Sequence, residues 1–134
     1  MKIKTVLALV AFVTVFSACA PTAITQPEEI RVPVGFDEAF DVVSTTINTQ
    51  PYPSCKGGWV ITNSDQVGGL ILAEMTYRTI DCNWFFGNSV PVTERVSVAL
   101  NELSDDMTAV NVSLSSGSEA QALANAVVEA LGDL

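Results

Sequence analysis

The sequence contains no histidine, the side chain that most often performs acid–base chemistry near neutral pH and most often binds transition metals. Without histidine a serine nucleophile has no partner for the usual triad, and the chain also has no Ser-x-x-Lys motif. The adjacent acids Asp105 and Asp106 suit a hairpin turn better than a pair of catalytic carboxylates. We therefore expect a protein that is not an enzyme, with no catalytic residues, no metal and no cofactor.

Basic residues are also scarce, because six lysines and arginines stand against fifteen aspartates and glutamates. Two of the six, Lys2 and Lys4, lie at the very start of the chain. From residue 19 onward the chain keeps four basic and all fifteen acidic side chains, a net charge of −11. A surface this acidic repels phosphate groups, so we expect no nucleic-acid partner and no electrostatic binding to anionic lipids.

The start of the chain has the layout of a secretory signal peptide. Lys2 and Lys4 precede an apolar run over residues 5–16, which is too short for a transmembrane helix. The run ends in Phe16-Ser17-Ala18-Cys19, which resembles the signal of bacterial lipoproteins, in which an aliphatic residue and two small residues precede a cysteine. Phe16 departs from that pattern, because leucine is commonest at its position.

This resemblance implies a lipid anchor. In the family, residues corresponding to 1–18 are removed, a diacylglyceryl group is attached to the Cys19 thiol, and the new amino terminus receives an acyl chain such as palmitate. Two or more acyl chains hold a protein stably on a membrane, whereas one gives only marginal binding. Ala20 is not the aspartate that resembles an inner-membrane retention signal, so we expect the outer membrane, facing the periplasm. The alternative is a secreted protein in which Cys19 is incidental.

The rest of the chain predicts a short tether and one domain. Residues 19–29 contain two prolines and no hydrophobic periodicity, which indicates a tether, and residues 30–134 suffice for a single domain. Hydrophobic periodicity predicts strands at 30–34, 59–63, 71–77, 90–100 and 110–114, and helices at 36–49 and 118–131. Ser118 and Gln121 predict a capping box for the second helix. The order β-α-β-β-β-β-α predicts an α+β fold, a two-layer structure in which two helices cover one face of an antiparallel sheet.

Two further cysteines, Cys55 and Cys82, predict a disulfide, because the compartment outside the cytoplasm is oxidising. The apolar faces of the second and third strands match when Trp59 lies opposite Tyr77 and Ile61 opposite Met75. That register places Cys55 opposite the neighbour of Cys82. The disulfide would then close the open end of this hairpin.

The predicted domain also resembles the small helix-on-sheet domains of short bacterial envelope lipoproteins, including a lipoprotein subunit of the outer-membrane β-barrel assembly machine. The resemblance depends on the order of the elements and on the spacing of Trp59, Asp65, Gly69 and Ala73 across one hairpin. It implies a similar fold and no catalytic residues.

Two groups of residues are candidates for contacts with other molecules. Trp84, Phe85 and Phe86 follow the second cysteine at a predicted hairpin tip, where they either form an aromatic patch for a partner or fold back over the end of the sheet. Arg78 and Arg95 lie on outward positions of neighbouring strands, and one register places them opposite each other. There they would either bind an external anion or pair with Glu74.

These observations favour a membrane-anchored envelope lipoprotein that acts as a non-enzymatic binding or assembly module. The membrane, reached through the lipid on Cys19, and an envelope protein are its expected partners. The alternative is a small-ligand-binding or hydrolytic envelope protein, which a deep apolar pocket between sheet and helices would favour.

Overall fold

The computed structural model describes residues 29–82 and 89–134. The predictions for the signal peptide, for Cys19 and for Trp84-Phe85-Phe86 concern residues outside these ranges. The described part consists of β1 (Glu29–Val32), α1 (Phe36–Thr49), β2 (Val60–Asp65), β3 (Leu70–Arg78), α2 (Thr79–Cys82), β4 (Pro91–Ser104), β5 (Met107–Leu114) and α3 (Ser118–Gly132). β1 begins at Glu29, so the strand includes the last residue of the predicted tether.

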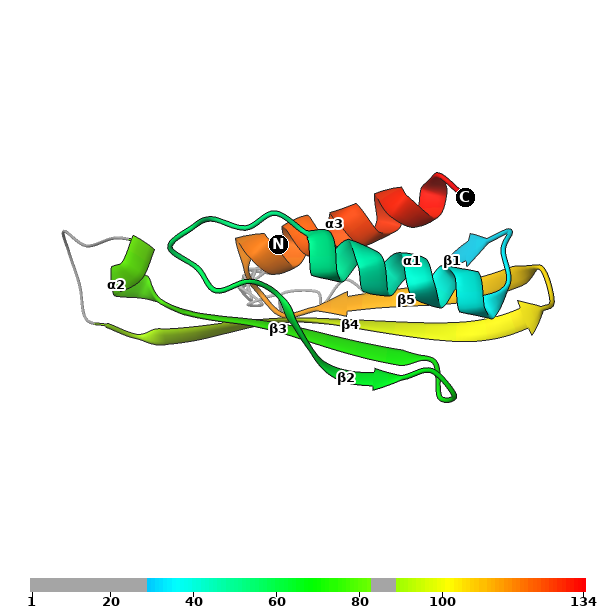
Figure 1. Cartoon of the computed structure of the whole chain (residues 1–134), viewed down its shortest axis with the longest axis horizontal. Coiled ribbons are helices and arrows are strands. Elements are labelled where there is room, and N and C mark those ends of the chain that lie inside the picture. The colour runs from blue at the N-terminus through cyan, green and yellow to red at the C-terminus, as the bar shows by residue number, and fades with distance from the viewer. Residues whose placement is uncertain (1–28, 83–88) are drawn as a thin grey trace, which may run out of the picture.

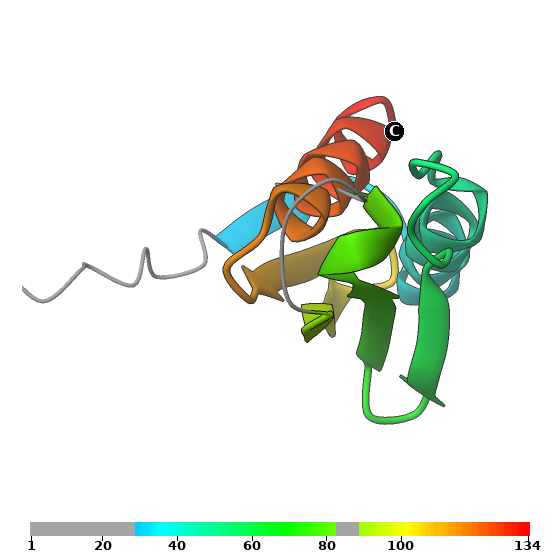
Figure 2. The same cartoon turned by 90° about the vertical axis from the view of Figure 1, so that its left-hand side faces the viewer.

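The five strands form one antiparallel sheet with the order β1-β5-β4-β3-β2. α1 and α3 lie side by side on the same face of this sheet, and the opposite face carries neither of them (Figure 1, Figure 2). The predicted α+β fold with two layers and two helices on one face is therefore confirmed. Among the described helices, none combines the length and the apolar character needed to cross a bilayer.

α1 forms because its sequence favours the start of a helix, provides an apolar face and stops the helix after Thr49. Asp37 and Glu38 lie in the first turn, where the positive end of the helix dipole favours acidic side chains. Its buried residues recur at helical spacing, at Ala39, Phe40, Val43 and Ile47. Pro51 follows soon after the last helical residue and prevents the helix from continuing. The observed range is the predicted one, 36–49.

The core fills the space between the sheet and the two helices. Alternate residues of a strand face the same side, so β3 and β4 each present a row of apolar side chains to the helices. Nearly all of the central side chains are fully buried: Ile71, Ala73, Met75, Val96, Val98 and Val110 from the sheet, Val43 and Ile47 from α1, and Leu123 and Val127 from α3. Burial of this apolar area provides most of the stability of the domain.

The predicted register between β2 and β3 is wrong by two residues. Ile61 lies opposite Ala73 instead of Met75, and a bulge follows between Ile61 and Asn63. A slip of two residues keeps every side chain on the same face, so the apolar pattern alone cannot distinguish the two registers. The slip also moves the second cysteine away from its partner along the strand. After β3 the chain forms α2, a single helical turn, and this turn places Cys82 next to Cys55.

Candidate functional site

Two opposite ends of the molecule carry groups of interacting polar side chains or lining carboxylates. One end contains the disulfide, α2 and the start of α3. We call it the stapled end and define it by Cys55, Lys56, Tyr77, Cys82, Glu94 and Glu119. The other contains the β2–β3 turn, the β4–β5 turn and the start of α1 (Figure 1). We call it the turn end and define it by Phe36, Asp37, Glu38, residues 66–68, residues 100–103 and residues 105–107.

The disulfide at the stapled end joins a loop to the sheet. Cys55 belongs to the segment between α1 and β2, which has no regular secondary structure, and Cys82 is the last residue of α2. Their Cα atoms are 5.1 Å apart, and the two sulfurs are bonded. The predicted Cys55–Cys82 disulfide is thus present, although α2 and not the predicted register brings the two residues together.

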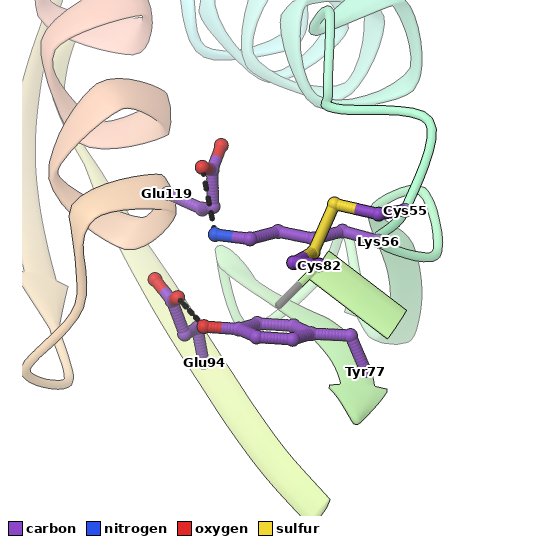
Figure 3. The surroundings of a disulfide bond; sticks show 6 residues. All are labelled: Cys55, Lys56, Tyr77, Cys82, Glu94 and Glu119. Carbon is purple, nitrogen blue, oxygen red and sulfur yellow. Dashed lines mark hydrogen bonds and ion pairs between the residues drawn. A yellow bond between two sulfur atoms is a disulfide. The ribbon is translucent and has the colours of Figure 1, made fainter. Parts of the chain in front are cut away.

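Lys56, beside the disulfide, connects the same loop to α3. Its Nζ atom lies 2.9 Å from Oε1 of Glu119 and 4.5 Å from the centre of the Tyr77 ring. The side chains of Lys56 and Glu119 are only 13% and 16% exposed, so water screens the pair weakly. Figure 3 shows the lysine extending from the loop between the aromatic ring and the glutamate.

Glu94 lies below this pair and is almost completely buried, with 1% of its surface exposed. The Tyr77 hydroxyl donates a hydrogen bond to its Oε1 atom at 2.8 Å, and the Ala120 amide donates to its Oε2 atom at 2.7 Å. Gly117 leaves room for this carboxylate, because a Cβ at that position would collide with it. One buried side chain therefore links β3, β4 and the first turn of α3.

The capping box predicted for α3 is wrong, and Glu94 replaces it. The residue before the helix is Gly117, which has no side chain, so the capping position accepts no hydrogen bond from the free amides of the first turn. The Glu94 carboxylate of β4 accepts a hydrogen bond from the third amide of the helix, that of Ala120. A capping residue usually accepts this hydrogen bond. The Gln121 side chain instead donates to Asn125 within the helix.

At the stapled end the pKa values of Lys56 and Tyr77 are both raised, and neighbouring carboxylates contribute to each shift. Burial and the hydrogen bond to Glu94 raise the pKa of Tyr77 above its usual 10.0. Burial works to lower the pKa of Lys56, but the hydrogen bond and charge of Glu119 outweigh it and raise the pKa above 10.5. At neutral pH Lys56 therefore stays protonated and Tyr77 stays neutral. The arrangement braces the fold.

The turn end contains an open hollow of about 450 Å³, lined by Phe36, Asp37, Gln66, Val67, Gly68, Leu100, Asn101 and Glu102. The Gln66 side chain donates a hydrogen bond of 3.0 Å to Asp37, which ties the β2–β3 turn to the start of α1. The Leu100 amide donates to the carbonyl of Gly69 at 2.7 Å and ties the same turn to β4. Gly69 has a φ of +68°, and a Cβ there would strike the Leu100 carbonyl, so only glycine suits this turn.

The carboxylates around the hollow have no basic partner among the described residues. The ion pairs in that part of the chain are Arg31–Glu29, Lys56–Glu119 and Arg95–Glu74, and none of them lies at the turn end. Asp37, Glu38, Glu102 and Asp105 instead line a second open hollow of about 450 Å³. Within the described ranges, acidic and cysteine side chains do not group in a way that would hold a metal ion.

The structure separates the two arginines proposed for anion contact. Arg95 lies opposite Glu74, and its Nε atom is 2.6 Å from Oε1 of that residue. Arg78 lies opposite Pro91 and donates a hydrogen bond of 3.3 Å to Ser89. The register that would face the two arginines is therefore wrong, and the alternative partner, Glu74, is the one that Arg95 contacts.

Sequence reasoning missed Glu94 and the turn end. Glu94 does leave a signal, because it occupies an inward position of β4 between Val92 and Val96. An acidic side chain on the buried face of a strand requires hydrogen-bond partners, so its position predicts a buried polar contact. The turn end leaves no comparable signal, because its residues come from three separate segments of the chain.

No protein-family model matches this chain, and no curated protein matches it significantly. Several solved structures resemble the backbone of this chain at low similarity. The di-domain aromatase/cyclase StfQ of the steffimycin biosynthetic pathway has a TM-score of 0.40 and 13% identity over 81% of this chain, which spans only 44% of StfQ. The Zhui aromatase/cyclase from Streptomyces sp. R1128 has a TM-score of 0.31 and 10% identity over 79% of this chain and 82% of its own. A START superfamily protein from Mycobacterium smegmatis has a TM-score of 0.36 and 12% identity over 79% and 90%. Likeness at this level carries no function over to this chain.

Proposed function

We propose that the mature protein is a lipid-anchored protein of the bacterial envelope that binds a partner and does not catalyse a reaction. The observation that carries this proposal is the set of contacts among Lys56, Tyr77, Glu94 and Glu119 at the stapled end, which we call the brace. Lys56, Tyr77, Glu94 and Glu119 are the buried or half-buried ionisable groups there, and each is engaged with another member of the set or with the backbone. Groups that already have partners within the fold stabilise a scaffold and are not available to bind a substrate.

The disulfide supports the proposed location of the protein in the envelope. Disulfides persist in oxidising compartments such as the periplasm, and the export signal directs the chain there. In the proposal nine residues, 20–28, separate the lipid-bearing Cys19 from the start of β1 at Glu29, and this stretch spans at most about 35 Å when extended. The domain would then work close to the membrane surface.

Replacement of the lipidated cysteine tests the anchor. We expect Cys19→Ser to move the protein from the membrane fraction to the soluble fraction, because the serine hydroxyl does not receive the lipid. The control is Ser17→Ala, which keeps a small residue before the cysteine and should leave the protein in the membrane. Membrane association that persists in Cys19→Ser would contradict the proposal.

Capture of partners from the envelope by cross-linking tests the binding role. Trp84→Ala with Phe85→Ser should reduce recovery of the cross-linked partner, and the melting temperature should stay nearly unchanged, if these aromatics contact the partner. A large fall in melting temperature would show instead that the rings belong to the core, and the contact assigned to them would be rejected.

A small-ligand receptor is the second candidate, and the hollow beside Phe36 is the observation that favours it. Its volume of about 450 Å³ lies within the range of small-molecule sites. The hollow lies at the end of the molecule and not between the sheet and the helices, where apolar side chains fill the space. A screen of small cationic and apolar compounds by thermal shift distinguishes this function from binding of a protein.

A further inference from the structure

We propose that the turn end is a docking surface for a basic, partly apolar segment of a partner protein. The proposal rests on the binding function proposed above and specifies the chemistry of the partner. Three observations carry it: exposed apolar side chains at or beside the two turns, carboxylates without basic partners among the described residues, and three hollows that share lining residues.

Exposed apolar side chains lie at the tip of the β2–β3 turn, where polar residues are usual, and in the strands beside the β4–β5 turn. Val67, in the β2–β3 turn, is fully exposed, and Leu103 and Met107, beside the β4–β5 turn, are 48% and 39% exposed. Val67 contributes nothing to the core, and Leu103 and Met107 each leave more than a third of their surface in water. Val67 itself lines the hollow that includes Phe36 and Leu100. A partner that covered the tips would bury this apolar surface.

The charge of the surface determines the kind of partner. Asp37, Glu38, Glu102 and Asp105 surround the hollows, and the described basic side chains are hydrogen-bonded elsewhere in the fold. An acidic segment would be repelled, both here and by the net charge of the whole chain. Lysine or arginine side chains of a partner would meet carboxylates that form no ion pair with any described residue.

The extent of the surface favours a segment over a small molecule. The hollow beside Val67 and the hollow beside Asp105 share Phe36, Asp37 and Glu102. A third hollow of about 520 Å³ continues from Asp37 along the exposed side of α1 to Thr46. Three neighbouring open hollows fit successive side chains of an extended or helical segment, as in other peptide-binding grooves.

A set of labelled peptides tests the proposal by fluorescence anisotropy on the complete mature chain. The probe is a twelve-residue peptide of lysine and leucine, and the controls are a lysine–serine peptide and a glutamate–leucine peptide of the same length. We expect the lysine–leucine peptide to bind best, because it alone matches both the charge and the apolar tips. Equal binding of the lysine–serine peptide would overturn the role of the apolar side chains.

Paired substitutions locate the site. Glu102→Gln with Asp105→Asn removes two charges at the turn end and should weaken binding roughly tenfold, the effect of about two exposed charge pairs. Asp81→Asn with Glu129→Gln removes two exposed charges elsewhere and should leave binding nearly unchanged. Equal losses in both variants would reveal general attraction to an acidic protein and overturn the proposal. Val67→Ser tests the tip and should also weaken binding.

Two further outcomes separate this inference from the proposed function. If lysine amide competes as strongly as the peptide does, the hollow is a small-ligand site and the docking surface is rejected. If the Glu102 and Asp105 variant still captures the envelope partner at wild-type yield, the surface is rejected although the binding function stands. Loss of capture in that variant, with folding shown intact by circular dichroism, supports both.

Discussion

The two ends of the domain use their polar residues in opposite ways. At the stapled end a disulfide, an ion pair, a cation–π contact and a buried carboxylate connect a loop, two strands and a helix (Figure 3). At the turn end carboxylates are exposed, apolar side chains at or beside the turns are wholly or partly exposed, and Gln66–Asp37 is a contact between exposed side chains. Groups buried at one end must be satisfied within the fold, whereas groups exposed at the other remain available to a partner.

This difference predicts how each end responds to mutation. Substitutions at the stapled end should change the free energy of unfolding, because they leave buried groups without partners. Substitutions at the turn end should change binding and leave folding almost intact. The following predictions test this contrast, from the largest expected effect to the smallest.

Removal of the disulfide should have the largest effect. Cys55→Ser with Cys82→Ser releases a loop with a sequence separation of 27 residues. The chain-entropy model gives a loss of about 3–4 kcal/mol in the free energy of unfolding for a loop of this length. Urea unfolding of the variant and of the oxidised wild type measures the loss. A change below about 1 kcal/mol would show that the brace holds this end without the disulfide.

Truncation of Glu94 should cost about 3 kcal/mol in the free energy of unfolding, because Glu94→Ala leaves the Tyr77 hydroxyl and the Ala120 amide without an acceptor. Glu94→Gln is the matched control, since its amide oxygen still accepts one of these bonds, and it should cost less. Urea unfolding of both variants gives the comparison. Equal losses in the two variants would mean that the charge matters and the hydrogen bonds do not.

Glu94 also shows what the sequence predicts and what it does not. The hydrophobic period predicts the range of α1 and the buried faces of α1 and β3, because burial acts on each residue according to its place in the period. The strand β3 extends one residue beyond the predicted range, 71–77, at each end. The cap of α3 depends on a residue 24 positions before Ser118 in the sequence, so local reading finds Ser118 and Gln121 instead. The β2–β3 register fails for a related reason, because two registers satisfy one apolar pattern.

Alkaline pH should weaken the stapled end. The pKa values of Tyr77 and Lys56 are both raised in the folded protein, so their contributions are complete below pH 10 and are lost as the pH rises through the folded pKa values. We expect the free energy of unfolding of the wild type to fall with increasing pH from about pH 10. Tyr77→Phe removes one of the two groups and should show a shallower fall, although it costs about 1 kcal/mol at neutral pH through the lost hydrogen bond. An identical pH profile in the variant would contradict this assignment.

The smallest effect is expected at the turn end. Glu102→Gln with Asp105→Asn should change the free energy of unfolding by less than about 0.5 kcal/mol, because both side chains are exposed and have no basic partner among the described residues. The change should be a gain, since these carboxylates repel Asp37 and Glu38 across the shared hollow. Salt screens exposed charges at these distances, so the gain should shrink when unfolding is repeated at 1 M salt. A loss above about 1 kcal/mol would mean that the turn end, like the stapled end, uses its charges to hold the fold. The contrast between the two ends would then fail, and with it the reason for expecting these carboxylates to be free for a partner.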